Sequence, residues 1–402
     1  MSTEASELFF DASEIVMYDQ IREDTLYIML YAVVTATAMM ACCYLLFRRA
    51  NAIAPDITPP ARLRRWTAVF FAVLVLNHLW YMPIFYISSG EDIMMTDLIG
   101  GLLDSMTVFP VAIIVLLAML QDRRRPLWPI AAMMAPIVVV GAFNIATRSF
   151  AILPIVYIYF LLMCIDFIVY MVRALRQYGR WLRENYADLE HKEVWQSFVV
   201  LAIIMLVFVI YVFTSEGPVY QYAMQVICIV LICYLLWRVE TLSDLSIKSI
   251  DDLQIDDLRF DSDDRDSSAV RTDDAQLSVH NNIGPLLQKY CIDTQLYLQH
   301  DLNLSQLAKA VGTNRFYLSQ YFSNQGLTYN AYINNLRVDH FVSLYREAVD
   351  AHRSFTAQQL AQESGFRSYN TFSSAFKRKT SLSVTAWIKA AHQDGKTNEG
   401  QE

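Results

Sequence analysis

Charged residues are scarce in this chain. Asp, Glu, Lys and Arg make up 18% of its 402 residues, whereas apolar residues make up 55%. Such a balance is unusual for a soluble protein. The scarcity is also uneven, because nearly all of the apolar excess lies before Arg238 and the remainder resembles an ordinary soluble chain. We therefore expect two parts of different character in a chain with room for two or three domains.

The six cysteines form no metal-binding or disulfide pattern. There is no CxxC pair and no histidine at metal-ligand spacing from a cysteine, and five of the six lie in apolar runs. We expect them to be small buried hydrophobic residues, with no metal site and no disulfide framework. They are Cys42, Cys43, Cys164, Cys228, Cys233 and Cys291.

Motifs of catalysis are missing as well. The sequence has no HExxH, no P-loop and no nucleophile elbow, and its apolar runs contain no lysine that could form a Schiff base with retinal. Inverted repeats, which are typical of transporters, are not evident either. We expect neither enzymatic activity nor a cofactor, although a transporter or membrane enzyme stays open as an alternative.

What the chain does contain is a set of long apolar runs. Seven of them are near the length of about 20 residues that a helix needs to cross a bilayer. The predicted fold class is therefore all-α and begins with a seven-helix transmembrane bundle. The acidic N-terminus has no basic n-region, so we do not expect it to be a signal peptide. The runs lie near 25–47, 66–89, 98–120, 127–146, 150–172, 196–214 and 219–238.

Basic residues predict the orientation of this bundle. Thirteen lie in the connections after the first, third and fifth runs, whereas the opposite side has only Arg22 and Arg148. Lys and Arg concentrate in cytoplasmic loops, so we expect the N-terminus outside and the C-terminus in the cytoplasm of a cell with an inner membrane. The thirteen are Arg48, Arg49, Arg62, Arg64, Arg65, Arg123, Arg124, Arg125, Arg173, Arg176, Arg180, Arg183 and Lys192.

A few polar residues interrupt or border the apolar runs. Asp104 and Asn144 lie in the outer parts of the third and fourth runs, and Arg148 follows just beyond. Polar groups at membrane depth are costly unless they are paired or functional. One interpretation is a pocket for a signal ligand built from these three residues. The other is ordinary hydrogen bonding between helices, which would also include Asn77 and His78.

Composition divides the chain into four segments. A membrane half at 1–240, with the role of a sensor, is followed by a linker at 241–282, a soluble domain at 283–391 and a disordered tail at 392–402. The linker is rich in Asp and Ser and poor in aromatic residues, as is typical of a solvated spacer.

The soluble domain contains an internal repeat. "NLSQLAKAVGTNRFYLSQYF" aligns with "TAQQLAQESGFRSYNTFSSAF", so that Gly312 falls on Gly365. Each copy predicts a short helix that begins with a capping box, Asn303 with Gln306 or Thr356 with a glutamine three residues later, and ends at the glycine. A second helix follows each glycine, and Asn314 and Ser368 are its expected caps in the two copies. The repeat therefore predicts a double helix-turn-helix.

The second helix of each copy would bury an apolar i, i+4 pair and expose polar residues. Asn and Gln can pair with adenine, Phe and Tyr can pack on a thymine methyl, and basic residues can hold phosphates. The expected base-facing residues are Asn314, Arg315, Phe316, Ser319 and Gln320 in the first copy and Tyr369, Asn370, Ser373 and Ser374 in the second. The expected phosphate contacts are Arg367, Lys377, Arg378 and Lys379.

Residues of about 284–390 closely resemble the AraC/XylS family of bacterial regulators. The resemblance rests on the repeat, on the long intervening segment "YNAYINNLRVDHFVSLYREAV" and on the "GF…F…FK" core that begins at Gly365. Two positions depart from the family pattern, with Ser381 in place of a glycine and Val384 in place of a proline. The resemblance implies that Phe316, Gln320, Tyr369, Asn370 and Ser374 face bases.

Together these features predict a membrane-embedded, one-component transcription regulator of AraC type. Its expected partners are promoter DNA, the lipid bilayer, an unknown signal ligand or membrane partner, and a second copy of the chain in a homodimer. Two alternatives stay open. One is a transporter or receptor with an accessory helix-turn-helix tail, and the other is a membrane scaffold whose tail binds protein.

Overall fold

The computed structural model describes residues 23–48, 51–55, 57–87, 90–147, 152–214, 218–245 and 283–399. These residues form helices and connecting turns, with no strand among them. The chain divides into two compact units. The membrane-half unit comprises Met1–Tyr178 and Val194–Ser246, and the C-terminal unit comprises Gly179–Glu193 and Ile247–Glu402.

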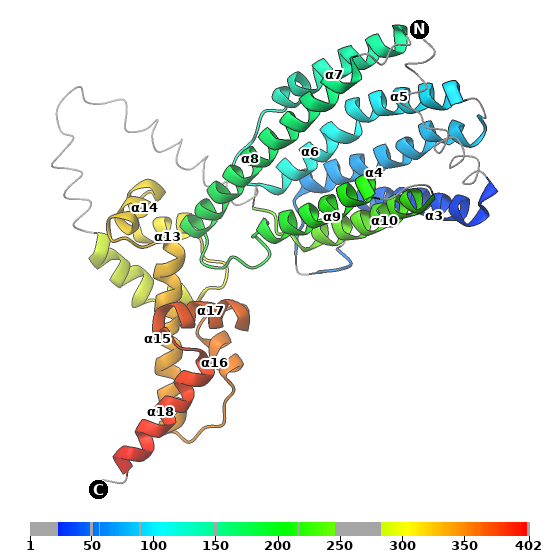
Figure 1. The fold of residues 1–402 in the computed structure, drawn as a ribbon. Helices are drawn as coiled ribbons and strands as arrows, with labels where there is room; N and C mark the ends of the chain where they lie inside the picture. Colours follow the sequence, from blue (N-terminus) through cyan, green and yellow to red (C-terminus); the bar gives the residue numbers. More distant parts are fainter. Residues whose placement is uncertain are drawn as a thin grey trace, which may run out of the picture. The chain divides into compact units, whose positions relative to one another are not determined.

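The membrane-half unit is a bundle in which α4 packs against α3, α6 and α10, while α5 packs against α7 and α9 packs against α10 (Figure 1). Long apolar stretches form these helices because a helix satisfies every backbone hydrogen bond within its own segment. Their bounds are α3 Thr25–Phe47, α4 Ala61–Tyr81, α5 Gly90–Met106, α6 Val108–Met119, α7 Trp128–Thr147, α8 Leu153–Asn185, α9 Trp195–Thr214 and α10 Pro218–Thr241, with a 3₁₀ turn, η1, at Met82–Phe85.

Six segments of the described chain are long and apolar enough to cross a membrane. They are Thr25–Phe47, Ala61–Phe85, Met95–Met119, Trp128–Thr147, Ile158–Asn185 and Gln221–Thr241. Each corresponds to a predicted run. The run at 196–214 corresponds to α9, of which Trp195–Val207 counts only as a shorter apolar helix. The predicted number of seven spans is therefore not confirmed.

Two predicted spans are interrupted next to prolines. The run at 98–120 is divided between α5 and α6 at Thr107, whose φ and ψ are −128° and −64°. Pro110 lacks an N–H, and its ring collides with the carbonyl four residues earlier, which belongs to the last residue of α5. The α-helix of the second run likewise ends at Tyr81, and the chain continues as η1 with Pro83 in its first turn.

Helix α8 is much longer than the predicted span at 150–172. Its 33 residues correspond to about 50 Å of helix, whereas the hydrocarbon core is about 30 Å thick. The unit boundary falls inside this helix, between Tyr178 and Gly179. The last seven residues of α8 and the loop that follows therefore belong to the C-terminal unit, a feature that the sequence did not indicate.

The C-terminal unit is organised along the long helix α15, Tyr329–Asp350 (Figure 1). Four elements precede it in the sequence: η2 Gln288–Ile292, η3 Leu296–Leu298, α13 Leu304–Val311 and α14 Arg315–Asn324. Three helices follow it: α16 Ala357–Glu363, α17 Tyr369–Thr380 and α18 Val384–Glu399. Helix α18 continues into the tail that was predicted to be disordered. A helix anchored by Trp387 in the core extends at little cost, since each further residue adds a hydrogen bond.

Two hydrophobic cores share α15. Ile333 in its first half packs with Leu318 and other residues of α13 and α14, whereas Phe341 in its second half packs with Phe372 and other residues of α16 and α17. Arg337 lies between the two cores and is 1% exposed. The predicted acidic linker lies outside the described residues from Ser246 onward.

Candidate nucleic-acid interface

The first helix pair, α13 and α14, begins with the predicted capping box. Asn303 Oδ1 accepts a hydrogen bond from the Gln306 N–H at 2.8 Å, and Gln306 Oε1 accepts one from the Asn303 N–H at 3.0 Å. The helix ends at Gly312, whose φ is +78°. Asn314 then caps α14 by accepting from the Tyr317 N–H at 2.9 Å. These local signals confirm the predicted turn geometry.

The second pair, α16 and α17, differs in one detail. Thr356 caps α16 by accepting from the Gln359 N–H at 3.1 Å, but the Gln359 amide donates forward to Glu363 at 3.1 Å. The predicted reciprocal capping box is thus only half formed, because an acceptor one turn later competes for the glutamine. Ser368 caps α17 as predicted, through the Thr371 N–H at 3.3 Å.

Glycine is required at position 365, in the turn between α16 and α17, for two reasons. Its φ is +91°, a conformation that is unfavourable for residues with a Cβ. A Cβ at this position would also lie 2.8 Å from Leu298 Cα, closer than non-bonded carbon atoms approach. Gly312 has the same backbone requirement but open space around it.

Helix α14 and its cap carry five of the predicted base-facing residues, of which two are exposed. Phe316 is 69% exposed, an unusual position for a large aromatic side chain, and Gln320 is also exposed. Arg315 and Ser319 are half-buried. The Asn314 side-chain oxygen is already used for capping, so only the amide nitrogen is left to donate to a ligand.

Helix α17 presents a similar face. Tyr369, Asn370 and Ser374 are exposed, and Ser373 is half-buried. The buried pair Phe372 and Phe376 lies on the opposite side, as the i, i+4 spacing predicted. Each second helix therefore combines an apolar face in a core with a polar and aromatic face in solvent.

The four predicted phosphate contacts fall into two groups. Lys377 and Arg378 are exposed on α17 and form no ion pair within the described part of the chain. Lys379 instead pairs with Asp339 of α15 and donates to the Asn335 carbonyl at 2.9 Å, and Arg367 lies 3.8 Å from Asp301. The sequence did not reveal the two aspartates as partners, because they are distant in the chain. Exposed ion pairs of this kind are weak, so a phosphate can displace the carboxylate.

The residues of the predicted signal pocket do not form one hydrogen-bonded group among the described residues. Asp104 accepts hydrogen bonds from Asn77 at 2.8 Å and from Tyr81 at 3.0 Å, both on α4. Asn144 is fully buried in α7, and its side-chain amide has no hydrogen-bond partner in the described chain. Arg148 lies outside the described residues. The contacts of Asp104 fit the interpretation of interhelical hydrogen bonding.

The sequence analysis did not predict the importance of three buried polar residues of α15. Asn330, Asn334 and Arg337 are at most 3% exposed, and all three bond to backbone carbonyls outside the helix. Their spacing of four and three residues places them on one face of the helix. This spacing could have indicated a set of buried hydrogen bonds, since polar residues on a buried face need partners.

Comparison with known proteins identifies the C-terminal unit. A family model described as a helix-turn-helix domain, of AraC type, matches residues 307–390, from α13 into α18. No curated protein and no solved structure matches the chain. The chain therefore carries a helix-turn-helix domain of the kind found in DNA-binding transcription regulators. Its described residues also include six segments that are long and apolar enough to cross a membrane.

Proposed function

We propose that this protein is a membrane-anchored, one-component transcription regulator of AraC type. It binds promoter DNA through two helix-turn-helix motifs, α13–α14 and α16–α17, under the control of a signal sensed by the membrane half. The observation that carries the proposal is the two capped helix pairs, α13–α14 and α16–α17, which pack on α15 and each have a polar and aromatic face in solvent.

The dimensions of α15 support recognition by both motifs. Its 22 residues correspond to about 33 Å of helix, close to the roughly 34 Å of one turn of B-DNA. Each half of α15 carries the core of one motif. The two second helices are thus suited to successive stretches of major groove on one side of the duplex.

The side chains have distinct roles in this proposal. Phe316 and Tyr369 contact thymine methyl groups, while Gln320 and Asn370 make hydrogen bonds to base edges. A group of supporting residues lines the same faces, namely Asn314, Arg315, Ser319, Ser373 and Ser374. Arg367, Lys377, Arg378 and Lys379 hold phosphates and so fix the register of the protein on DNA.

The membrane half anchors the protein and receives the signal. The bias of basic residues supports an external N-terminus and a cytoplasmic C-terminal unit, which is the compartment where DNA is accessible. A pocket that includes Asp104, Asn144 and Arg148 remains our proposal for the signal site. It is supported by the buried Asn144 amide without a partner among the described residues. A homodimer, which operators with repeated half-sites would require, is also proposed.

Selection of DNA by the full-length protein tests the proposal. We would purify the chain in detergent, select bound sequences from a random duplex pool and repeat the selection with Gln320→Ala and Asn370→Ala. A defined motif that loses information at different positions in the two variants is expected. Enrichment of no motif, or an unchanged motif in both variants, would contradict sequence-specific binding.

The alternative is a transporter or receptor whose tail is an accessory module. No observation in the described part of the chain specifically favours this alternative. Mapping of bound DNA in cells distinguishes the two, because an accessory protein-binding tail would occupy no promoter.

A further inference from the structure

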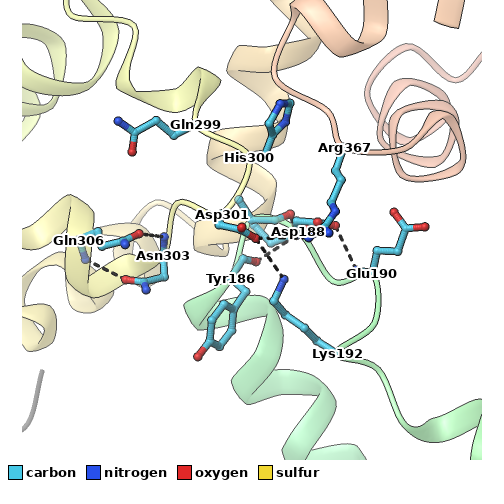
Figure 2. Close-up of polar contacts among 12 residues, drawn as sticks. Tyr186, Asp188, Glu190, Lys192, Gln299, His300, Asp301, Asn303, Gln306 and Arg367 are labelled. Atoms are coloured by element: carbon cyan, nitrogen blue, oxygen red, sulfur yellow. Dashed lines mark hydrogen bonds and ion pairs between the residues drawn. The ribbon is translucent and has the colours of Figure 1, made fainter. Parts of the chain in front are cut away.

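The loop Tyr186–Glu193, between α8 and α9, is part of the C-terminal unit. We call it the α8–α9 loop. It lies beside the segment Tyr297–Asn303, which precedes α13: Figure 2 shows Tyr186, Asp188 and Lys192 of the loop close to Asp301 and Asn303 of that segment. Tyr186 also forms an isolated antiparallel bridge with Asn303, the capping residue of α13. A segment far upstream in the sequence thus lies within the helix-turn-helix unit.

Two buried asparagines of α15 hold this loop. Asn330 Nδ2 donates to the Ala187 carbonyl at 2.6 Å and to the Tyr186 carbonyl at 3.2 Å, and Asn334 Nδ2 donates to the Ala187 carbonyl at 3.1 Å. Ala187 is fully buried and belongs to the first hydrophobic core. A buried amide without an acceptor is destabilising, so the C-terminal unit is incomplete without the loop carbonyls.

A buried charge accompanies the loop. Asp188 is 3% exposed, and its Oδ1 accepts from the Glu190 N–H at 3.0 Å. It interacts electrostatically with Arg337. Burial lowers the pKa of Arg337, and the negative charges of Asp188 and Asp301 act in the opposite direction. The loop therefore supplies part of the charge compensation for the cation between the two cores.

The segment Tyr297–Asn303 also contacts the second helix-turn-helix. Lys192 Nζ lies 3.9 Å from Asp301 Oδ1, and Arg367 Nη1 lies 3.8 Å from the same oxygen (Figure 2). His300 Nδ1 donates to the Gly365 carbonyl at 3.1 Å. One carboxylate is thus shared between the loop and an arginine beside the second recognition helix.

We propose that the α8–α9 loop is a docking segment for the helix-turn-helix unit and carries the state of α8 to the DNA-binding face. Asn330 and Asn334 bind the backbone of the loop. Lys192 competes with Arg367 for the Asp301 carboxylate. When the loop is docked, Lys192 shares Asp301 with Arg367. The carboxylate then holds Arg367 less strongly, and a phosphate displaces it more easily. The docking is inferred from the contacts alone, whereas its effect on DNA binding rests on the proposed function.

Helix α8 is the covalent connection through which a change in the membrane half would reach the loop. Helix α8 begins in the membrane-half unit and continues without interruption to Asn185, the residue directly before the loop. A helix transmits displacement along its axis because its backbone hydrogen bonds resist stretching. A shift or rotation of α8 caused by a signal would therefore act directly on Tyr186 and Ala187, which α15 holds.

Hydrogen exchange in the purified full-length protein tests docking independently of DNA. The amides of the loop should be protected in the unmodified protein. Asn330→Ala combined with Asn334→Ala should speed their exchange by about tenfold or more, as expected for lost buried hydrogen bonds. The matched control is Asn335→Ala, on the same helix but only half-buried. Loop amides that exchange freely in the unmodified protein, or that respond equally to the control, would overturn docking.

Charge variants of similar side-chain size test the coupling. Lys192→Gln should weaken binding of a selected operator about two- to five-fold, because the contact of 3.9 Å is long and its carboxylate partner is solvent-accessible. Asp301→Asn should strengthen binding. Both effects should vanish when Arg367→Gln is also present. Glu363→Gln, which removes a negative charge paired with Arg353 instead, is the matched control.

The outcomes of the two experiments separate the two claims. A protected loop in a protein that binds no DNA would leave docking intact and contradict the proposed function. Effects of Lys192→Gln that persist in the Arg367→Gln background would overturn the coupling through Asp301, because the charge would then act on DNA by general electrostatics.

Discussion

Arg337 Nε donates a hydrogen bond of 2.8 Å to the carbonyl oxygen of Tyr297. A second donor of the same guanidinium reaches the Gln299 carbonyl at 2.6 Å. Arg337 thereby joins the middle of α15 to the segment before α13, at the level where one hydrophobic core ends and the other begins. This side chain therefore adds to α15 a second connection between the regions of the two helix pairs, α13–α14 and α16–α17.

Replacing Arg337 tests its importance for the C-terminal unit. Arg337→Lys keeps the charge but cannot reach both carbonyls with one ammonium group, and we expect a loss of about 2–4 kcal/mol in the free energy of unfolding. Denaturant unfolding followed by hydrogen exchange in α15 measures the loss in the full chain. Arg346→Lys, at an exposed position of the same helix, should change it by less than about 0.5 kcal/mol.

The two turn glycines should respond differently to alanine. Gly312→Ala meets no neighbouring atom, so only the positive φ penalises it, by about 1–2 kcal/mol. Gly365→Ala has the same penalty and additionally pushes against the Leu298 backbone, so it should be clearly more destabilising. Thermal unfolding of the two variants checks the order. Equal losses would mean that the close approach at Gly365 relaxes without cost.

Ser381 offers a stabilising substitution. It ends α17 with a φ of +62°, a conformation that glycine adopts more readily, and it replaces a glycine of the AraC/XylS pattern. We expect Ser381→Gly to stabilise the unit by about 1 kcal/mol, visible as slower hydrogen exchange near the end of α17. Ser383→Gly, two residues later, lacks this benefit, and a gain of the same size there would refute the explanation.

Base and phosphate contacts should be distinguishable in binding. Gln320→Ala or Asn370→Ala should cost about 1–3 kcal/mol on the operator and little on random DNA. Lys377→Gln should weaken binding to every sequence and reduce the slope of log K against log salt by about 1. Fluorescence anisotropy at several salt concentrations measures both. Lys309→Gln, on the first helix of its pair, serves as the charge control.

Topology decides whether the C-terminal unit can meet DNA. Reporter fusions after Leu120 and Trp237 should have cytoplasmic activity, and fusions after Ser89 and Ser215 should have external activity, because the basic loops stay inside. An external fusion after Trp237 would exclude the proposed function, since the helix-turn-helix domain would lie on the wrong side of the membrane.

The local features of the helix-turn-helix domain could be read from the sequence. Asn303, Gly312, Asn314 and Ser368 occupy the caps and turns that their residue types predicted, because capping depends on neighbours within four residues. The inward positions of Phe372 and Phe376 followed from helical periodicity in the same way. Six apolar segments also agreed with the predicted runs, since spanning length is a local property.

Only the tertiary structure decided which distant groups meet. Asn330 and Ala187 are 143 residues apart, and nothing in either neighbourhood predicts their hydrogen bond. The pairings of Asp301 with Lys192 and Arg367 likewise depend on packing that brings three chain segments together. Caps and periodicity are properties of a few consecutive residues, whereas the position of a buried polar partner is determined by how whole helices pack.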